Sequence, residues 1–184
     1  MIVGITGTDG GGKGTVVDYL VAEKGFVHCS ARALWVDEIQ KRGLEANRAN
    51  MRIVANSLRA ERGDDYLVQE YLRRAREEGW KDFVIESLRA IAEAETLKKN
   101  GGVLFAVDAD PKVRYARIQE RASESDQVTF DEFIAHEQLE MNDPDPHGMQ
   151  KEKVIALADY VITNNGTLEE LRARVDEILA KMGV

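Results

Sequence analysis

The chain has 184 residues and a mass of 20.6 kDa, and 43% of its residues are hydrophobic, which is enough for one globular domain with a substantial core. Acidic side chains number 33 and basic ones 25, and the resulting charge of −8 argues against a general nucleic-acid surface, because such a surface needs a basic face. The single cysteine rules out an internal disulfide, and no apolar run reaches membrane-spanning length. We therefore expect a cytoplasmic protein without a nucleic-acid or membrane partner.

The first predicted element is a buried strand from Met1 to Ile5, a run rich in β-branched residues. Glycines follow at positions 7, 10, 11, 12 and 14, and a helical pattern begins at Val16. Glycines between a strand and a helix N-terminus allow several backbone N–H groups to point at one anion, and the helix dipole adds partial positive charge. The stretch from Gly7 to Thr15 therefore predicts a phosphate cradle.

Lys13 stands at the spacing of the P-loop pattern G-x-x-x-x-G-K, in which the lysine reaches the outer phosphates of a nucleoside triphosphate. The strict pattern continues with Ser or Thr, whereas here Gly14 precedes Thr15. The form G-x-x-G-x-G-K-G-T resembles the loop of adenylate kinase and other nucleoside monophosphate kinases. The alternative, a flexible glycine turn that binds nothing, is disfavoured because the strand and the helix that the motif requires flank the loop.

A second strand is predicted over residues 25–29. The pattern that follows is helical, with breaks at Gly43 and Gly63, and it is too long for a single crossover helix. We therefore predict a helical insertion over residues 31–79, in the place where monophosphate kinases hold the acceptor nucleotide. Two of its arginines are candidate ligands of an anionic acceptor: Arg32 and Arg59. The alternative for such arginines is a solvated position on a helix surface.

Strands and helices then alternate along the chain. A strand over residues 82–86 ends in an acid, a helix follows over 90–99, and a strand over 103–108 leads to a helix that begins at Pro111, a favoured residue of the first turn. Such alternation predicts a parallel sheet in an α/β fold. We expect a P-loop three-layer α/β/α fold with a parallel five-stranded sheet.

One more helix is predicted over residues 130–141, after a polar stretch. Residues 142–148 contain two prolines and a glycine, which oppose continued helix. Three side chains alternate in this loop as metal ligands would: Asp143, Asp145 and His147. We interpret the segment as an ordinary connecting loop, because polar loops interrupted by proline usually are.

The last predicted elements are a strand over residues 158–163, a tight turn, and a helix whose N-cap Thr167 has Glu170 three residues further on. The stretch from Ala158 to Leu168 resembles dephospho-CoA kinase, which is the runner-up. The pattern of that enzyme has an Asp just after the second strand, where it activates a hydroxyl group. This chain has Ser30-Ala31-Arg32-Ala33 there.

Three motifs resemble nucleoside monophosphate kinases, in particular the archaeal and bacterial adenylate-kinase-related branch. They are the loop from Gly7 to Thr15, the acid-x-x-Arg from Glu86 to Arg89 and the Arg-x-x-x-Arg from Arg117 to Arg121. The resemblance covers most of the chain and implies a single P-loop kinase domain over residues 1–184, with ATP and Mg²⁺ as cofactors. Residues 31–79 would then bind the acceptor, and residues 117–148 would form a short lid.

The resemblance also implies which residues hold the nucleotide and its metal ion. The nucleotide-binding set is Asp9, Gly10, Gly11, Gly12, Lys13, Gly14, Thr15, Arg117 and Arg121. Within it, Asp9 lies where thymidylate kinases also carry an acid, so it would contact the acceptor or the metal shell. Thr15 and Glu86 are the expected Mg²⁺ ligands, and the alternative role of Glu86 is to cap the next helix.

Positive charge defines the remaining roles that the resemblance implies. Arg89, together with Arg32 or Arg59, is expected to bind the acceptor phosphate. The catalytic set is Lys13, Arg89 and Arg121, whose charges would offset the charge of the passing phosphoryl group.

The chemistry of the acceptor decides between the possible functions. A phosphate acceptor is already anionic near neutral pH, whereas a hydroxyl acceptor needs a general base within reach. Because no Asp follows the second strand, we predict ATP-dependent phosphoryl transfer to a small phosphorylated acceptor, a nucleoside or deoxynucleoside monophosphate. Val36 stands where the family pattern has an Arg, which argues against specificity for AMP and leaves a deoxynucleotide, another monophosphate and a non-nucleotide phosphate open. The alternatives are transfer to a hydroxyl group and a non-catalytic nucleotide-binding regulator, although residues 164–167 do not supply the guanine motif Asn-Lys-x-Asp.

Overall fold

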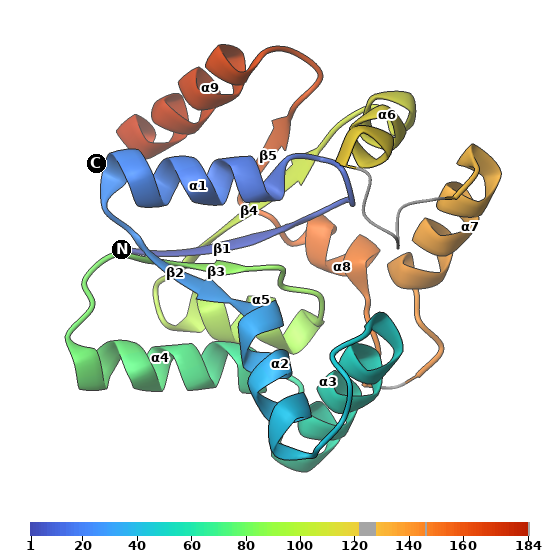
Figure 1. Cartoon of the computed structure of the whole chain (residues 1–184). Helices are drawn as coiled ribbons and strands as arrows, with labels where there is room; N and C mark the ends of the chain where they lie inside the picture. Colours follow the sequence, from blue (N-terminus) through green and yellow to red (C-terminus); the bar gives the residue numbers. More distant parts are fainter. Residues whose placement is uncertain (122–127, 146, 184) are drawn as a thin grey trace.

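A parallel sheet of five strands forms the centre of the computed structural model, which describes residues 1–121, 128–145 and 147–183 (Figure 1). The strands are β1 (Ile2–Gly7), β2 (Val27–Ser30), β3 (Phe83–Glu86), β4 (Val103–Asp108) and β5 (Tyr160–Thr163). Their order across the sheet is β2-β3-β1-β4-β5, and every neighbouring pair is parallel. The predicted fold class is confirmed. Because parallel strands end at one edge, that edge carries the loops that can bind a ligand.

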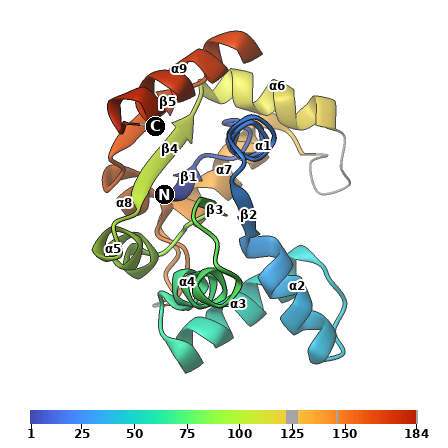
Figure 2. The same ribbon diagram turned by 90° about the vertical axis from the view of Figure 1, so that its left-hand side faces the viewer.

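Helices cover both faces of this sheet, which makes three layers (Figures 1 and 2). One face packs against α1 (Lys13–Lys24) and α9 (Leu168–Lys181), and the other against α4 (Tyr66–Glu78), α5 (Ile91–Lys99) and α8 (Lys151–Ala156). Side chains of a strand alternate between faces, so Val3 and Ile5 of β1 enter the first core, whereas Ile2 packs against the second. The sheet is therefore covered on both sides, as expected for a parallel one.

The predicted insertion over residues 31–79 consists of three helices, of which the first directly follows the edge strand β2 and the last packs on a face of the sheet (Figure 2). They are α2 (Ala31–Lys41), α3 (Arg48–Arg62) and α4. Both predicted breaks are confirmed: Gly43 follows the end of α2 with a φ of 69°, and Gly63 caps α3 by donating its N–H to the carbonyl of Arg59. A residue with a positive φ stops a helix, because the backbone can no longer continue its hydrogen bonds.

Two helices follow β4 on the side of the sheet where the strands end (Figure 1). They are α6 (Pro111–Arg121) and α7 (Phe130–Met141). The predicted helix over residues 130–141 is confirmed, and it begins with a capping box in which the Thr129 side chain accepts from the Glu132 N–H. The predicted lid, residues 117–148, includes 122–127 and 146, which lie outside the described residues.

The helix α8 has no counterpart in the sequence prediction. Two strand starts also differ by two residues: β2 begins at Val27, because Gly25 with a φ of 72° still caps α1, and β5 begins at Tyr160. The final helix and its capping box at Thr167 and Glu170 are confirmed. Within the three described ranges, no helix combines the length and the apolar character needed to cross a membrane.

Candidate active site

The glycine-rich loop lies between the end of β1 and the start of α1, at the edge where the strands end. Gly12 is the N-cap of α1 with a φ of 102°, a conformation that favours glycine. A Cβ at Gly12 would also clash with the side-chain amide of Asn164, whose Nδ2 donates to the carbonyl of Gly11 at 2.9 Å. The first amides of α1 therefore face the loop without a side-chain cap, which is the arrangement that binds phosphate.

Lys13 folds back over this loop. Its Nζ donates to the carbonyl of Thr8 at 2.7 Å and to that of Gly7 at 3.3 Å, and it lies 3.6 Å from Asp9 Oδ1. Burial lowers the pKa of Lys13 to about 8, although the charge of Asp9 opposes this shift. An ammonium group whose hydrogen-bond partners are backbone carbonyls of the loop can exchange those carbonyls for phosphate oxygens.

Asp9 has a second basic neighbour that sequence reasoning missed. The Nζ of Lys151, at the start of α8, lies 3.3 Å from Asp9 Oδ1 and 2.8 Å from Glu140 Oε2. Burial alone would raise the pKa of Asp9, but the nearby positive charges, that of Lys151 first, hold this pKa well below its usual range. The charge of Lys151 likewise outweighs burial and lowers the pKa of Glu140. Both carboxyl groups are thus ionised and poor proton acceptors.

Glu86 closes β3 beside the loop, where the sequence predicted a metal ligand. Its Oε2 lies 2.9 Å from His28 Nε2, and its charge opposes the lowering of the Lys13 pKa, which places the carboxylate near that ammonium group. The next residue, Ser87, has a φ of 66°, the single non-glycine residue with a positive φ in the described ranges. Such strain is typical of functional sites, where surrounding contacts hold it in place.

Arg89 follows directly and is half-buried. Its Nη1 lies 3.0 Å from Met149 Sδ, and its carbonyl accepts from the Gln150 N–H at 2.8 Å. The guanidinium group thus has a weak thioether partner and no carboxylate partner in the described part of the chain. A guanidinium group in such surroundings is available to bind a phosphate. The assignment of Arg89 to the acceptor phosphate stays a prediction.

Arg32 and Arg59, both assigned to the acceptor, lie in different surroundings. Arg32 is exposed in the first turn of α2. Arg59 is buried, its Nη2 lies 3.2 Å from the fully buried Glu93 Oε1, and its guanidinium group covers the ring of Trp35 at 5.7 Å. The other oxygen of Glu93 accepts the backbone N–H of Arg89 and of the following residue. This ion pair gives Arg59 a structural role, which argues against its assignment to the acceptor.

A buried arginine of α6, Arg114, connects the loop to the predicted lid. Its Nε donates to the carbonyl of Ala109, Nη1 lies 3.4 Å from the carbonyl of Asp9, and Nη1 and Nη2 pair with both oxygens of Glu137 on α7. Arg117, one turn further along α6, has a buried Nη1 without a hydrogen-bond partner among the described residues. Arg121 is exposed at the end of α6. The assignment of Arg117 and Arg121 to the nucleotide stays a prediction.

Described residues of the loop over 142–148 contact α3 and the turn that follows it. Arg52 Nη2 lies 2.9 Å from Asp143, Asn56 Nδ2 lies 2.8 Å from Asp145, and His147 Nδ1 lies 2.8 Å from Asp64, in the turn after α3. No group of three potential ligands occurs within residues 1–121, 128–145 and 147–183. The described residues of this segment lie outside helices and strands, which agrees with a connecting loop.

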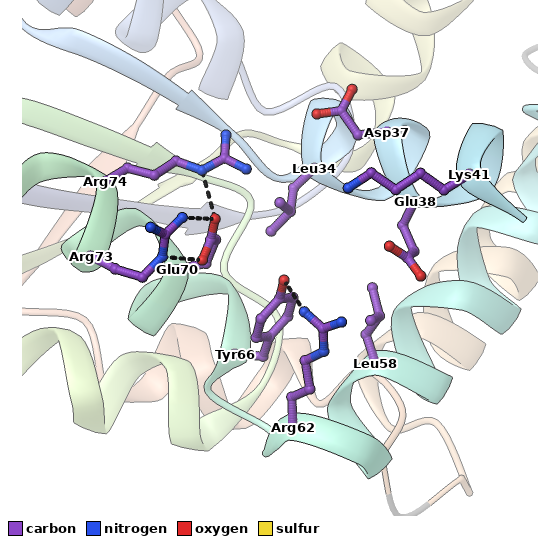
Figure 3. A pocket seen from close by; sticks show the side chains of 10 residues that line it. All are labelled: Leu34, Asp37, Glu38, Lys41, Leu58, Arg62, Tyr66, Glu70, Arg73 and Arg74. Atoms are coloured by element: carbon purple, nitrogen blue, oxygen red, sulfur yellow. Dashed lines mark hydrogen bonds and ion pairs between the residues drawn. The ribbon is translucent and has the colours of Figure 1, made fainter. Parts of the chain in front are cut away.

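A separate pocket of about 230 Å³ lies among α2, α3 and α4 (Figure 3). Leu34 and Leu58 contribute its apolar part, while Arg73 and Arg74 both pair with Glu70. No residue of the glycine-rich loop lines it. Because its own carboxylate neutralises two of its cations, we do not place phosphate chemistry there.

Known sequences resemble nearly the whole length of this chain. A profile described as an AAA domain matches residues 3–143. A UPF0200 protein of Thermococcus kodakarensis is 31% identical over 192 residues, which cover 99% of this chain and 100% of that protein. A UPF0200 protein of Methanothermobacter thermautotrophicus is 29% identical over 184 residues, with 99% and 90% covered.

Comparison with solved structures concerns the fold. Shikimate kinase from Bacteroides thetaiotaomicron has a TM-score of 0.61 at 15% identity, with 98% of each chain covered. Shikimate kinase from Acinetobacter baumannii, in complex with shikimate, has a TM-score of 0.58 at 16% identity, with 98% of this chain and 93% of that chain covered. The chain therefore has a P-loop kinase-like fold, whose glycine-rich loop is suited to nucleotide binding.

Proposed function

Because the chain belongs to the UPF0200 family and carries a P-loop on an AAA-domain fold, we propose that it transfers the γ-phosphoryl group of ATP to a small phosphorylated molecule, a nucleoside or deoxynucleoside monophosphate. The fold and the loop support nucleotide binding. The choice of a phosphate acceptor rests on the charges around the loop.

The observation that carries the proposal is the chemistry of the carboxyl groups beside the P-loop. The pKa of Asp9 and that of Glu140 are both lowered by the charge of Lys151, so neither group readily takes a proton from a hydroxyl. A phosphate acceptor needs no such base. It needs cations, and Lys13 and Arg89 lie on the edge of the sheet where it would approach.

Two residues fit the Mg²⁺ ion that this reaction implies. Thr15 is exposed in the first turn of α1, and the Glu86 carboxylate is close enough to Lys13 to affect its pKa. Hydroxyl and carboxylate oxygens are the ligands that Mg²⁺ prefers. When bound, Mg²⁺ would offset the negative charge of the phosphates.

In the proposed step, an oxygen of the acceptor phosphate attacks the γ-phosphorus, and the bond from that phosphorus to the β,γ-bridging oxygen breaks. The electron pair leaves with ADP, and no proton has to move when the acceptor is fully ionised. The amides at the start of α1 hold the β- and γ-phosphates, Lys13 adds positive charge, and Arg89 orients the acceptor with its planar fork.

A second candidate is transfer to a hydroxyl group, and one observation favours it. His28 of β2 lies 2.9 Å from Glu86, the last residue of β3. An imidazole that is hydrogen-bonded to a carboxylate is a common general base in enzymes. The same pair would then serve as the base that the sequence lacks after β2.

The test is to incubate the protein with Mg-ATP and, separately, a panel of ribo- and deoxynucleoside monophosphates, dephospho-CoA, and no acceptor. Products are identified by mass spectrometry, and Lys13→Ala serves as the inactive control. A new anhydride bond on a monophosphate supports the proposal, and a phosphorylated hydroxyl supports the second candidate. ATP binding without any transfer product would point to a non-catalytic regulator.

A further inference from the structure

Lys151 lies beside Asp9 of the glycine-rich loop, although no sequence motif predicts it there. It is 1% exposed at the start of α8, 142 residues away from Asp9 in the chain. Lysine is almost never this deeply buried unless it is paired, because losing hydration costs several kcal/mol, roughly, per ion. Here the partners are Asp9 and Glu140.

The pairing with Asp9 places Lys151 at the P-loop itself. The same oxygen, Asp9 Oδ1, lies 3.3 Å from Lys151 Nζ and 3.6 Å from Lys13 Nζ. Two ammonium groups thus approach the same carboxylate oxygen, which belongs to the glycine-rich loop. Two lysine ammonium groups close to the same atom are typical of a binding site for a highly charged anion.

The charges of this cluster suit an exchange of partners when nucleotide binds. Lys13, Lys151 and Arg89 all act on Asp9, and the carboxylates in the cluster offset their charge in the free protein. A triphosphate brings several further negative charges to the loop. Repulsion between those phosphates and Asp9 favours a new contact from Lys151 to a phosphate oxygen, while Glu140 keeps its own contact at 2.8 Å.

Lys151 is also held in place by the backbone around it. The preceding residue, Gln150, donates its N–H to the carbonyl of Arg89 at 2.8 Å, which ties the start of α8 to the segment after β3. A cation fixed in this way needs little reorganisation during the reaction, and preorganised charges are the most effective ones in catalysis.

We propose that Lys151 is a catalytic residue that contacts the γ-phosphoryl group, and that Glu140 positions it. This rests on the proposed function for its role in transfer, but the contact with the γ-phosphate requires only that ATP binds. During transfer, Lys151 stays protonated and donates to a non-bridging oxygen of the γ-phosphoryl group, while the bond to ADP breaks and the bond to the acceptor oxygen forms. The positive charge of Lys151 thus stabilises negative charge on the γ-phosphoryl oxygens during transfer.

The experiment compares binding of ADP with binding of the non-hydrolysable ATP analogue AMP-PNP, by calorimetry, in wild type and Lys151→Met. AMP-PNP carries the γ-phosphoryl position and ADP does not. Lys153→Met is the matched control, because Lys153 is exposed on the same short helix. Since Lys151→Met removes the ion pair with the buried Glu140, the double variant Lys151→Met with Glu140→Gln is measured beside it, and Lys151→Arg tests rescue of the charge.

We expect Lys151→Met and the double variant to bind AMP-PNP about 10- to 100-fold more weakly and ADP within about twofold of wild type. Lys151→Arg should recover part of the loss, and Lys153→Met should match wild type. Equal weakening of both nucleotides, or no change in either, overturns the assignment.

Turnover separates this inference from the proposed function. If wild type transfers phosphate to no acceptor while Lys151→Met still loses AMP-PNP selectively, the proposed function fails and the γ-phosphate contact stands. If wild type and Lys151→Met transfer phosphate at the same rate, the catalytic assignment of Lys151 fails and the proposed function stands.

Discussion

The buried pair of Arg59 and Glu93 gives the sharpest prediction, because it sets a structural role against the acceptor role predicted from the sequence. We consider Arg59→Met, which keeps much of the side-chain volume and removes the charge. Glu93 is fully buried, so its carboxylate would lose its only charged partner in the described part of the chain. Removing one partner of a buried pair costs about 3–5 kcal/mol.

The structure places the expected loss at the lower end of that range. Glu93 would keep two backbone N–H donors, from Arg89 and Ala90, which continue to stabilise its charge. The cation–π contact with Trp35 at 5.7 Å is lost as well. We expect the free energy of unfolding to fall by about 3–4 kcal/mol, which for a domain of this size lowers the Tm by roughly 6–16 °C.

Urea unfolding followed by circular dichroism measures the loss. The matched control is Arg62→Met, one turn later on α3, whose exposed guanidinium group contacts Tyr66 and which should cost about 1 kcal/mol or less. Glu93→Gln and the double variant complete a double-mutant cycle. If Arg59→Met unfolds like wild type while the KM for the acceptor rises at least tenfold, Arg59 binds the acceptor and the reasoning from burial is wrong.

Three further predictions concern the loop and its neighbours. Lys13→Ala should lower kcat by about 10²–10³-fold at saturating ATP with little change in Tm, and wild-type turnover would remove Lys13 from the site. Because burial lowers the pKa of Lys13 to about 8, the free protein loses this charge as the pH rises through that value, so kcat/KM for ATP should fall above about pH 8. Lys13→Arg stays charged, and the same fall in that variant would assign the titration to another group. Arg89→Lys loses the planar fork and should raise the KM of the acceptor more than that of ATP, whereas the opposite order would place Arg89 on the donor side.

The fold was predictable because its signals are local. Each strand is a short apolar run that a glycine or polar residue ends, and the glycines from 7 to 14 stand between a strand and a helix as the P-loop pattern requires. The breaks at Gly43 and Gly63 were visible for the same reason. Local sequence therefore carried the element order, and the parallel sheet followed from the alternation of strands and helices.

The candidate site was only partly predictable, because some of its contacts join distant parts of the chain. Lys151 lies in a six-residue helix after a proline-containing loop, too short to show a helical period, and a lysine is expected at the surface. The partner of Arg59 is a glutamate in α5 that looks like any polar helix residue. Arg114 was visible in the same helix as Arg117 and Arg121, and its spacing of four from the buried Ile118 was the signal that it faces inward.

The lid is the last prediction, and the structure limits how it can move. On one side, Arg114 pairs with Glu137 of α7 while also approaching the Asp9 carbonyl. On the other, Asp143 pairs with Arg52 of α3. Through these contacts, α7 and the residues after it are connected to the glycine-rich loop and to α3 of the predicted acceptor-binding insertion. We therefore expect hydrogen exchange over residues 128–145 to slow when a bisubstrate analogue binds. Glu137→Gln should speed exchange in the free protein by about 10- to 100-fold, since a charge-assisted contact is lost, and by much less in the bound one. Equal exchange in free and bound wild type would mean that α7 is a static arm.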